Sequence, residues 1–276
     1  MIHPIYDDPL LWLRPFPAEP RNLLEKHWHE IAISFIFYQV LYYLSAPICA
    51  YIFGSHYTHE ISKKQRINFD IHVVALVQSF ISILLTLPLF KDPMWKEDPI
   101  FGHTPFSNLV SALTAGYFIW DSIVCIQHFK MFGLGFLLHA FAALYVFMMA
   151  FKPFCQPWIP AYLIFELSTP FVNINWFIAR LPDGYVSTKF TVINGLLLMV
   201  TFFSVRIVWG LYAVVQTFAD YWPIRDQVPG WLALPIFALN LLLDVLNMYW
   251  FYKMVLIAKK KFKKSKSNDE KLKKSK

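Results

Sequence analysis

The sequence predicts an all-α membrane protein, a polytopic bundle of about seven transmembrane helices. Of its 276 residues, 57% are hydrophobic and only 16% are charged, whereas a soluble domain carries about a quarter charged residues. The charges are also clustered, because residues 31–59, 71–90 and 131–151 contain no Asp, Glu, Lys or Arg. A helix needs about 20 apolar residues to cross the hydrocarbon core. Each of these stretches is long enough to do so.

The apolar pattern divides the chain into seven spans. They cover residues 31–53, 70–90, 107–127, 132–151, 158–178, 190–217 and 231–257. The fifth is interrupted by Pro160 and Pro170 and contains Glu166. Prolines are tolerated in a span where neighbouring groups satisfy the freed carbonyls.

Four parts of the chain follow from these spans. We expect a lumenal segment at 1–30, an extra first span and cytosolic loop at 31–65, the main helical domain at 66–257 and a basic disordered tail at 258–276.

Lysine and arginine residues orient the chain. Seventeen of them lie on the side of the C-terminus, eleven of these at or beyond Lys253, against seven on the side of the N-terminus. Because positive residues gather on the cytosolic side, we expect a lumenal N-terminus and a cytosolic C-terminus. The last four residues, 273–276, include Lys273 and Lys274 and resemble a dilysine signal. A retrieval coat that returns membrane proteins to the endoplasmic reticulum reads such signals, although an ordinary lysine-rich end explains them equally well.

Charge and cysteine usage exclude several kinds of partner. The net charge of +7 comes largely from the tail, where it suits contact with anionic lipid headgroups and does not predict nucleic-acid binding. The three cysteines, Cys49, Cys125 and Cys155, form no metal-binding spacing. His27 and His29 alternate just before the first span, which suits neither one helical face nor a known motif. The sequence therefore predicts no metal site.

Ionisable and amide groups within the spans are the candidate functional residues, because a charge in hydrocarbon is costly and usually faces the bundle interior or a wet cavity. The candidate cavity-lining residues are His72, Asp121, His139, Glu166, Asn173, Arg206, Asp244 and Asn247. Arg206 cannot remain unpaired in a span, so we expect it to meet Glu166, Asp244 or Asp121.

The depth of these residues predicts where a cavity should open. With the tail in the cytosol, the two histidines, Asp121 and Asn173 fall in the cytosolic half of their spans, and the others lie near the midplane. We therefore expect a cavity that opens toward the cytosol and closes near the middle. An acyl chain, a long-chain base or a phospholipid would fit it.

Six blocks of sequence carry a resemblance to a known family. They are FDIHVVALVQS (69–79), GYFIWD (116–121), LLHAFAALY (137–145), FELSTPFVNINWF (165–177), VINGLLLMVTFFSVRI (192–207) and LLLDVLNMYW (241–250). In order and spacing they resemble the TLC-domain family, the membrane proteins related to TRAM, Lag and CLN proteins. The resemblance is to the branch of small fungal and animal TLC proteins without a homeobox-like insert rather than to the true ceramide synthases, and it covers about residues 66–257.

The resemblance implies a fold and a setting. It implies six core helices ringed around a lipid-sized cavity, with the first span as an extra. It also implies residence in the endoplasmic reticulum or another endomembrane and a role in lipid homeostasis.

The resemblance also points to a histidine. In the ceramide synthases of this family, a histidine pair in the fourth span is needed to transfer an acyl group from acyl-CoA to a sphingoid base. His139 matches the first position of that pair, but Ala140 stands at the second, and the downstream histidine-and-aspartate motif is absent. Imidazole accepts an acyl group only if a neighbour takes its proton. Asp121 or Glu166 would have to do so from another helix.

The sequence therefore favours binding over catalysis. The first hypothesis is an endomembrane protein of lipid homeostasis that binds a membrane lipid in its bundle and needs no cofactor. The alternative is an acyl-CoA-dependent N-acyltransferase of ceramide synthase type, with His139 and Asp121 as catalytic residues, acting on sphingolipids. A third is a lipid transporter or scramblase. The sequence leaves open which lipid is bound and whether the chain forms a homodimer.

Overall fold

The computed structural model describes residues 7–274, with side chains described to residue 260, and contains no strand in that range. The α-helices are α1 (Leu23–Ser55), α2 (Lys63–Leu89), α3 (Met94–Glu97), α4 (Pro105–Gln127), α5 (Phe129–Met149), α6 (Ile159–Leu163), α7 (Thr169–Ile178), α8 (Thr188–Phe202), α9 (Trp209–Tyr221) and α10 (Gly230–Lys274). The 3₁₀ segments are η2 (Leu11–Leu13), η4 (Gln156–Trp158), η5 (Ile164–Ser168) and η7 (Trp222–Gln227). Two segments, η3 (His56–Glu60) and η6 (Phe203–Val208), are π-helical.

Capping residues fix where several helices begin. The Ser62 side chain accepts a hydrogen bond from the backbone N–H of Gln65, whose own side chain accepts one from the backbone N–H of Ser62, at the start of α2. Thr104 and Ser107 form the same reciprocal pair at the start of α4, where Pro105 occupies the first turn. These pairs satisfy backbone donors that have no partner inside the helix.

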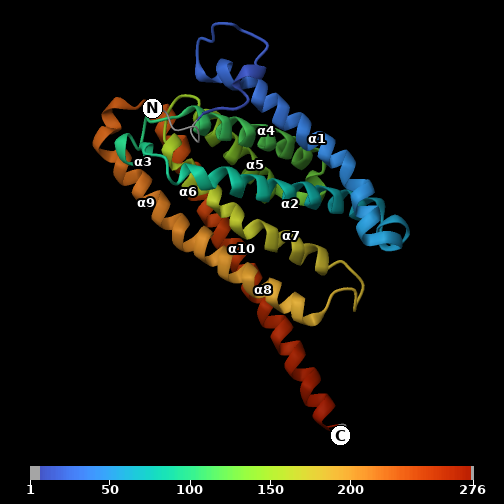
Figure 1. The fold of residues 1–276 in the computed structure, drawn as a ribbon. Coiled ribbons are helices and arrows are strands. Elements are labelled where there is room, and N and C mark those ends of the chain that lie inside the picture. Colours follow the sequence, from blue (N-terminus) through green and yellow to red (C-terminus); the bar gives the residue numbers. More distant parts are fainter. Residues whose placement is uncertain (1–6, 275–276) are drawn as a thin grey trace.

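The seven predicted spans correspond to six long helices and one interrupted helix. Among the described residues, six helices are long and apolar enough to cross a membrane, at residues 23–60, 63–89, 105–127, 129–149, 188–227 and 230–260. The predicted fifth span is instead a run of short pieces, η4, α6, η5 and α7, which passes beside α2 (Figure 1). Pro160 and Pro170 lie in the first turns of α6 and α7. A proline in the first turn is compatible with the helix that follows it. Because proline has no backbone N–H, it cannot donate a hydrogen bond to the preceding turn, so the helix is interrupted there.

Six of these segments close a ring. Each of α2, α4, α5, α10, α8–α9 and α6–α7 contacts the next in that order, and α6–α7 contacts α2 again. The helix α1 lies outside the ring, against α2 and α4 (Figure 1). The contacts therefore confirm the expected six-helix core with an extra first span.

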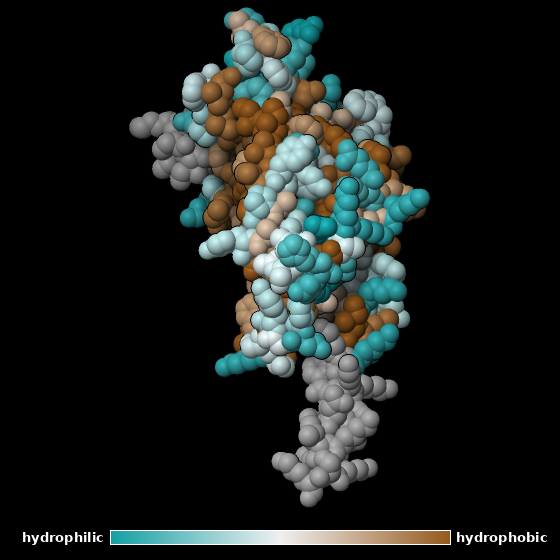
Figure 2. Space-filling model, turned by 90° about the vertical axis from the view of Figure 1, so that its right-hand side faces the viewer, coloured by the Kyte–Doolittle hydropathy of each residue, from teal (hydrophilic) through white to brown (hydrophobic). Residues whose placement is uncertain are grey.

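The outer faces of the helices are apolar. Large side chains such as Ile36, Leu84, Leu196 and Leu234 are exposed there, and Figure 2 shows broad hydrophobic areas beside separate hydrophilic patches. A soluble monomer rarely exposes contiguous apolar patches of more than a few hundred Å². This surface is suited to contact with lipid chains.

The helix α10 extends further than expected. The sequence predicted a disordered tail from residue 258, whereas α10 continues to Lys274 and projects from the bundle (Figure 1). The segment contains neither Gly nor Pro and is rich in Lys, a good helix former, so a helix that begins in the bundle can propagate through it. The side chains of Lys273 and Lys274, on which the dilysine prediction rests, lie outside the described residues.

Gly116 allows α1 and α4 to pack closely. A Cβ atom at this position would lie 2.4 Å from the carbonyl oxygen of Ile31 and 2.6 Å from Cβ of Ser34. The close approach also lets the Ser34 hydroxyl donate a 2.6 Å hydrogen bond to the carbonyl of Leu113.

We predict that Gly116→Ala lowers the stability of the detergent-purified protein, because the added methyl group forces α1 away from α4. Overpacking of this kind costs about 1–3 kcal/mol, and thermal unfolding followed by tryptophan fluorescence would show it as a lower Tm. The matched control is Gly195→Ala in α8, where a Cβ meets no other atom within 4 Å. Equal Tm changes in both variants would contradict this account of the helix contact.

Candidate functional site

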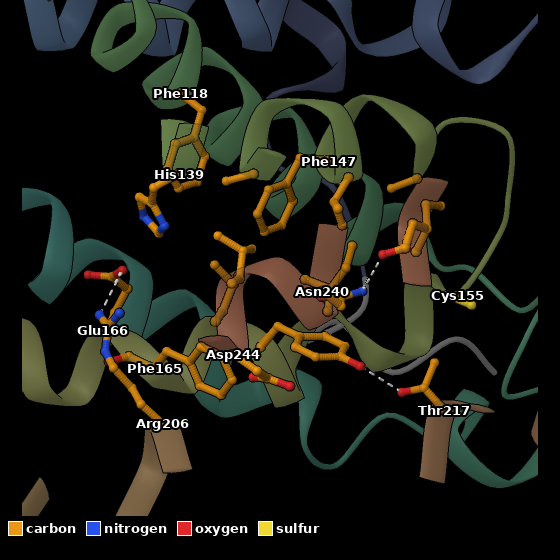
Figure 3. A pocket seen from close by; sticks show the side chains of 18 of the residues that line it. Phe118, His139, Phe147, Cys155, Phe165, Glu166, Arg206, Thr217, Asn240 and Asp244 are labelled. Carbon is orange, nitrogen blue, oxygen red and sulfur yellow. Dashed lines mark hydrogen bonds and ion pairs between the residues drawn. The ribbon is translucent and has the colours of Figure 1, made fainter. Parts of the chain in front are cut away.

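A cavity lies inside the ring between α4, α5, α6–η5, η6–α9 and α10 (Figure 3). The centre of a water-sized sphere can occupy about 80 Å³ inside it, whereas a cavity that holds one water needs about 10–15 Å³ on this measure. The apolar lining comprises Phe118, Ala143, Val146, Phe147, Ala150, Phe154, Ile159, Leu163, Phe165, Ile236 and Leu243. The polar lining comprises His139, Cys155, Tyr162, Glu166, Arg206, Thr217, Asn240 and Asp244.

The cavity occupies the half of the bundle near the N-terminal end, which we define as the end that carries residues 7–22 and the loops 90–104, 150–158 and 222–229. Its lining reaches Cys155 in the loop after α5, Thr217 late in α9 and Ile236 early in α10. The predicted cavity, open toward the side of the C-terminus, is therefore wrong. Sequence spacing gave the depth of each polar residue, but the rotation of each helix decides which residues face the cavity.

Arg206 lines the cavity and forms hydrogen bonds with the interrupted helix. Its Nε donates hydrogen bonds to the carbonyl oxygen of Phe165 (3.2 Å) and the hydroxyl of Ser168 (2.9 Å). Its Nη2 donates one to the hydroxyl of Thr169 at 3.0 Å. The carboxylate of Glu166 lies 3.8 Å from Nη2 (Figure 3), so of the three expected acidic partners Arg206 pairs with this one.

Arg206 also reaches a third segment of the ring. Its Nη1 donates a 3.4 Å hydrogen bond to Oδ1 of Asn247 in α10. The arginine belongs to the π-helical segment η6, and single π-helical turns inside longer helices are frequent at functional sites. Arg206 therefore ties the interrupted helix, η6 and α10 together.

Two polar atoms in the cavity have no hydrogen-bond partner among the described residues. They are Nδ1 of His139 and Oδ2 of Asp244, and both are buried. The ring of His139 packs edge-on against Phe118 and Trp250, with centroid distances of 6.0 and 5.8 Å. Asp244 lies on the opposite wall in α10 (Figure 3). A buried polar atom without a partner costs about 1–3 kcal/mol, so both atoms are candidate contacts for a ligand.

Four predicted cavity residues lie elsewhere. Nδ1 of His72 is 2.6 Å from Oδ1 of Asn173, and its ring stacks on Trp176 at 3.8 Å. These groups therefore satisfy one another between α2 and α7. Asp121 accepts a weak contact from the Cys125 thiol at 3.9 Å and does not line the cavity. Asn247 contributes only through its bond to Arg206.

The structure adds polar residues that the list of candidates missed. The hydroxyl groups of Tyr162 and Thr217, which both line the cavity, lie 3.0 Å apart. Tyrosine and threonine are common in packed helices, so the sequence carried no signal for them. Asn240 had a signal, because it lies four residues before Asp244 and shares its helical face.

No hydrogen bond joins His139 to a carboxylate among the described residues. Among the described residues, neither Asp121 nor Glu166 forms a hydrogen bond with it, although acyl transfer through imidazole needs a base within about 2.6–3.2 Å or one water away. The site has a long apolar wall. Its polar groups include the Arg206–Glu166 ion pair and two atoms without hydrogen-bond partners among residues 7–260, Nδ1 of His139 and Oδ2 of Asp244. This combination can hold a molecule with an apolar chain and a small polar head.

Comparison with known proteins agrees with the fold. The TLC domain matches residues 68–256 of the chain. The chain is 42% identical to Topoisomerase I damage affected protein 4 of Saccharomyces cerevisiae, over 87% of each chain. It is 32% identical to human TLC domain-containing protein 4, over 80% of this chain and 85% of the human protein. It is 29% identical to TLC domain-containing protein 4-B of Danio rerio, over 82% and 86%.

We predict that Arg206→Gln destabilises the protein far more than Glu166→Gln. The first change removes the donors to Phe165, Ser168 and Thr169, and a hydrogen bond that involves a charged group contributes about 1.5–3 kcal/mol. The second keeps a polar side chain beside an arginine that still has its other partners. Thermal unfolding in detergent would measure the difference.

The control for this comparison is Arg225→Gln, which changes an exposed arginine paired with an exposed aspartate and should leave the Tm nearly unchanged. If Arg206→Gln unfolded at the temperature of this control, the arginine would not hold the interrupted helix.

Proposed function

The chain belongs to the TLC-domain family of membrane proteins, and from that premise we propose that it binds an amphipathic lipid in the cavity and acts in lipid homeostasis. The observation that carries the proposal is the pair of buried, unpartnered atoms on opposite walls, Nδ1 of His139 and Oδ2 of Asp244. A lipid head that donates to Asp244 and exchanges a hydrogen bond with His139 would remove both desolvation costs.

The charges of the cavity select the kind of head group. Glu166 lies against Arg206, so the positive charge of the arginine is already compensated within the protein. Asp244 adds a further acid without a partner among the described residues. A phosphate would meet this acid, whereas a hydroxyl or amino group can donate to it. The cavity therefore suits a neutral or cationic head, such as that of a long-chain base, better than an anionic one.

The apolar lining supports the binding of the lipid's hydrocarbon chain. The wall of α5, from Ala143 through Phe147 to Ala150, and the facing Ile236 of α10 provide no hydrogen-bonding side chain. Burial of a hydrocarbon chain between them is favoured by about 25 cal/mol per Å² when the chain leaves water, and by van der Waals contact when it leaves lipid.

An N-acyltransferase remains a second candidate because of one observation. The imidazole of His139 lines the cavity, and its buried Nδ1 has no hydrogen-bond partner among the described residues. The absence of a hydrogen-bonded acid at His139 among residues 7–260 favours binding instead. Purified protein supplied with labelled acyl-CoA and a sphingoid base would distinguish them: transfer that His139→Ala abolishes would establish the enzyme, and no transfer by the parent protein would exclude it.

The location of the protein is part of the same proposal. The excess of lysine and arginine on the side of the C-terminus supports a lumenal N-terminus and a cytosolic tail in the endoplasmic reticulum or another endomembrane. With that orientation the cavity lies in the lumenal half of the bundle. Its ligand would then enter from the lumenal leaflet or from the membrane interior.

We predict that a lipid with a hydroxyl or amino head co-purifies with the protein in mild detergent and that Asp244→Asn reduces its amount. The substitution removes the charge that accepts the head-group hydrogen bond, and a hydrogen bond to a charged group contributes about 1.5–3 kcal/mol, or roughly 10- to 100-fold in affinity. Mass spectrometry of the extracted lipids, normalised to protein, measures the change.

Asp121→Asn is the matched control, because it makes the same exchange in a span without touching the cavity. The parent protein and this variant should retain equal amounts of lipid. The proposal would be wrong if the parent protein retained no lipid above a detergent blank, or if the two variants lost lipid equally.

A further inference from the structure

Three side chains capable of binding a metal converge at the N-terminal end of the bundle, outside the cavity. They are Asp8, from the segment before η2, and His27 and Glu30, from the first two turns of α1. Nδ1 of His27 lies 3.0 Å from Oε2 of Glu30 and 3.3 Å from Oδ2 of Asp8. A residue pair at i and i+3 on one helix is thus completed by a residue 19 positions earlier.

The cluster is buried and carries excess negative charge. The side chains of His27 and Glu30 have 0% exposure and that of Asp8 has 1%. Even a protonated histidine compensates only one of the two carboxylates. An uncompensated buried charge is strongly destabilising. A divalent cation would compensate both carboxylates and leave His27 neutral.

The hydrogen bonds of the cluster are incomplete in a way that fits a ligand. Oδ2 of Asp8 and Oε1 of Glu30 are buried and have no hydrogen-bond partner among the described residues. The Asp8 oxygen faces His27 at 3.3 Å. Oδ1 of Asp8 accepts a hydrogen bond from the backbone N–H of Leu10, and Oε2 of Glu30 pairs with Nδ1 of His27. Each carboxylate therefore keeps one buried oxygen without a hydrogen-bond partner among the described residues, although buried polar groups are normally hydrogen-bonded.

The distances also fit a metal site. Zinc binds imidazole nitrogen at about 2.0–2.1 Å and carboxylate oxygen at about 2.0–2.2 Å in tetrahedral sites. Ligand atoms around such an ion are about 3.3–3.6 Å apart. The two separations from Nδ1 of His27, 3.0 and 3.3 Å, are close to this range, and the three ligand atoms all lie within 4.8 Å of one another. One nitrogen and two oxygens favour Zn²⁺ or a similar transition-metal ion over Ca²⁺ or Mg²⁺, which prefer oxygen alone.

We propose that Asp8, His27 and Glu30 bind a divalent transition-metal ion such as Zn²⁺ that anchors the N-terminal segment to α1. His29 supports the site from outside: its Nε2 lies 3.4 Å from Oε1 of Glu30 and 3.1 Å from the carbonyl oxygen of Leu10. The ring of Phe151, in the loop after α5, stacks against His27 at 6.2 Å and covers the site. Three protein ligands leave one position for water.

The test uses full-length protein purified in detergent without a histidine tag. It is dialysed against Zn²⁺, then against metal-free buffer, and analysed by elemental mass spectrometry. The proposal expects about one Zn²⁺ per chain in the parent protein and a loss of most of it in Asp8→Asn and Glu30→Gln. The matched control is Glu60→Gln, which alters the exposed His56–Glu60 pair (2.9 Å) at the opposite end of the bundle and should keep the metal.

A second measurement does not depend on the folding of any variant. A strong chelator should lower the Tm of the parent protein, and added Zn²⁺ should restore it, because a ligand bound only by the folded state stabilises that state. The proposal is overturned if the parent protein retains no Zn²⁺ and shows no change in Tm. In that case His27 is an imidazolium held between the acids. It is equally overturned if Asp8→Asn and Glu30→Gln retain as much Zn²⁺ as the control.

Discussion

Arg206 and the backbone that it satisfies form the interaction on which the bundle depends. A membrane-spanning segment must satisfy its backbone hydrogen bonds within the protein, and the interrupted helix at residues 156–178 cannot do so alone. Arg206 donates to the Phe165 carbonyl and to the side chains of Ser168 and Thr169. One guanidinium group thus ties a backbone carbonyl and two side chains of the irregular segment to the neighbouring helix of the ring.

The cavity follows from the same irregularity. The 3₁₀ turns of η5 and the π-helical turns of η6 contact each other in neighbouring segments of the ring, and neither follows the regular period of an α-helix. Gly210, at the start of α9, leaves room for the ring of Phe165, since a Cβ there would lie 3.0 Å from Cζ of Phe165. Regular helices would pack their side chains together at this level. The irregular turns instead leave Glu166 and Asp244 at the wall of a cavity.

The sequence predicted the helices and the pairing of Arg206 with an acid, because charge-free stretches and the cost of a lone charge are local properties. The ring was implied by the resemblance to the TLC-domain family. It did not predict which polar residues would share a cavity. His72 and Asn173 pair with each other, and this depends on helix rotations that spacing does not determine. It also missed the Asp8–His27–Glu30 cluster, because Asp8 comes from a loop whose path only the folded chain defines.

The central claim is that the ligand lies between α5 and α10 with its head at His139 and Asp244. The most direct test is a photoactivatable long-chain base with its reactive group near the head, crosslinked to the purified protein and mapped by peptide mass spectrometry. The account predicts crosslinks to cavity residues such as His139, Phe147 or Asn240, and their loss when unlabelled base is added in excess. Crosslinks confined to lipid-facing residues such as Leu84 or Leu196, and unaffected by competitor, would contradict it.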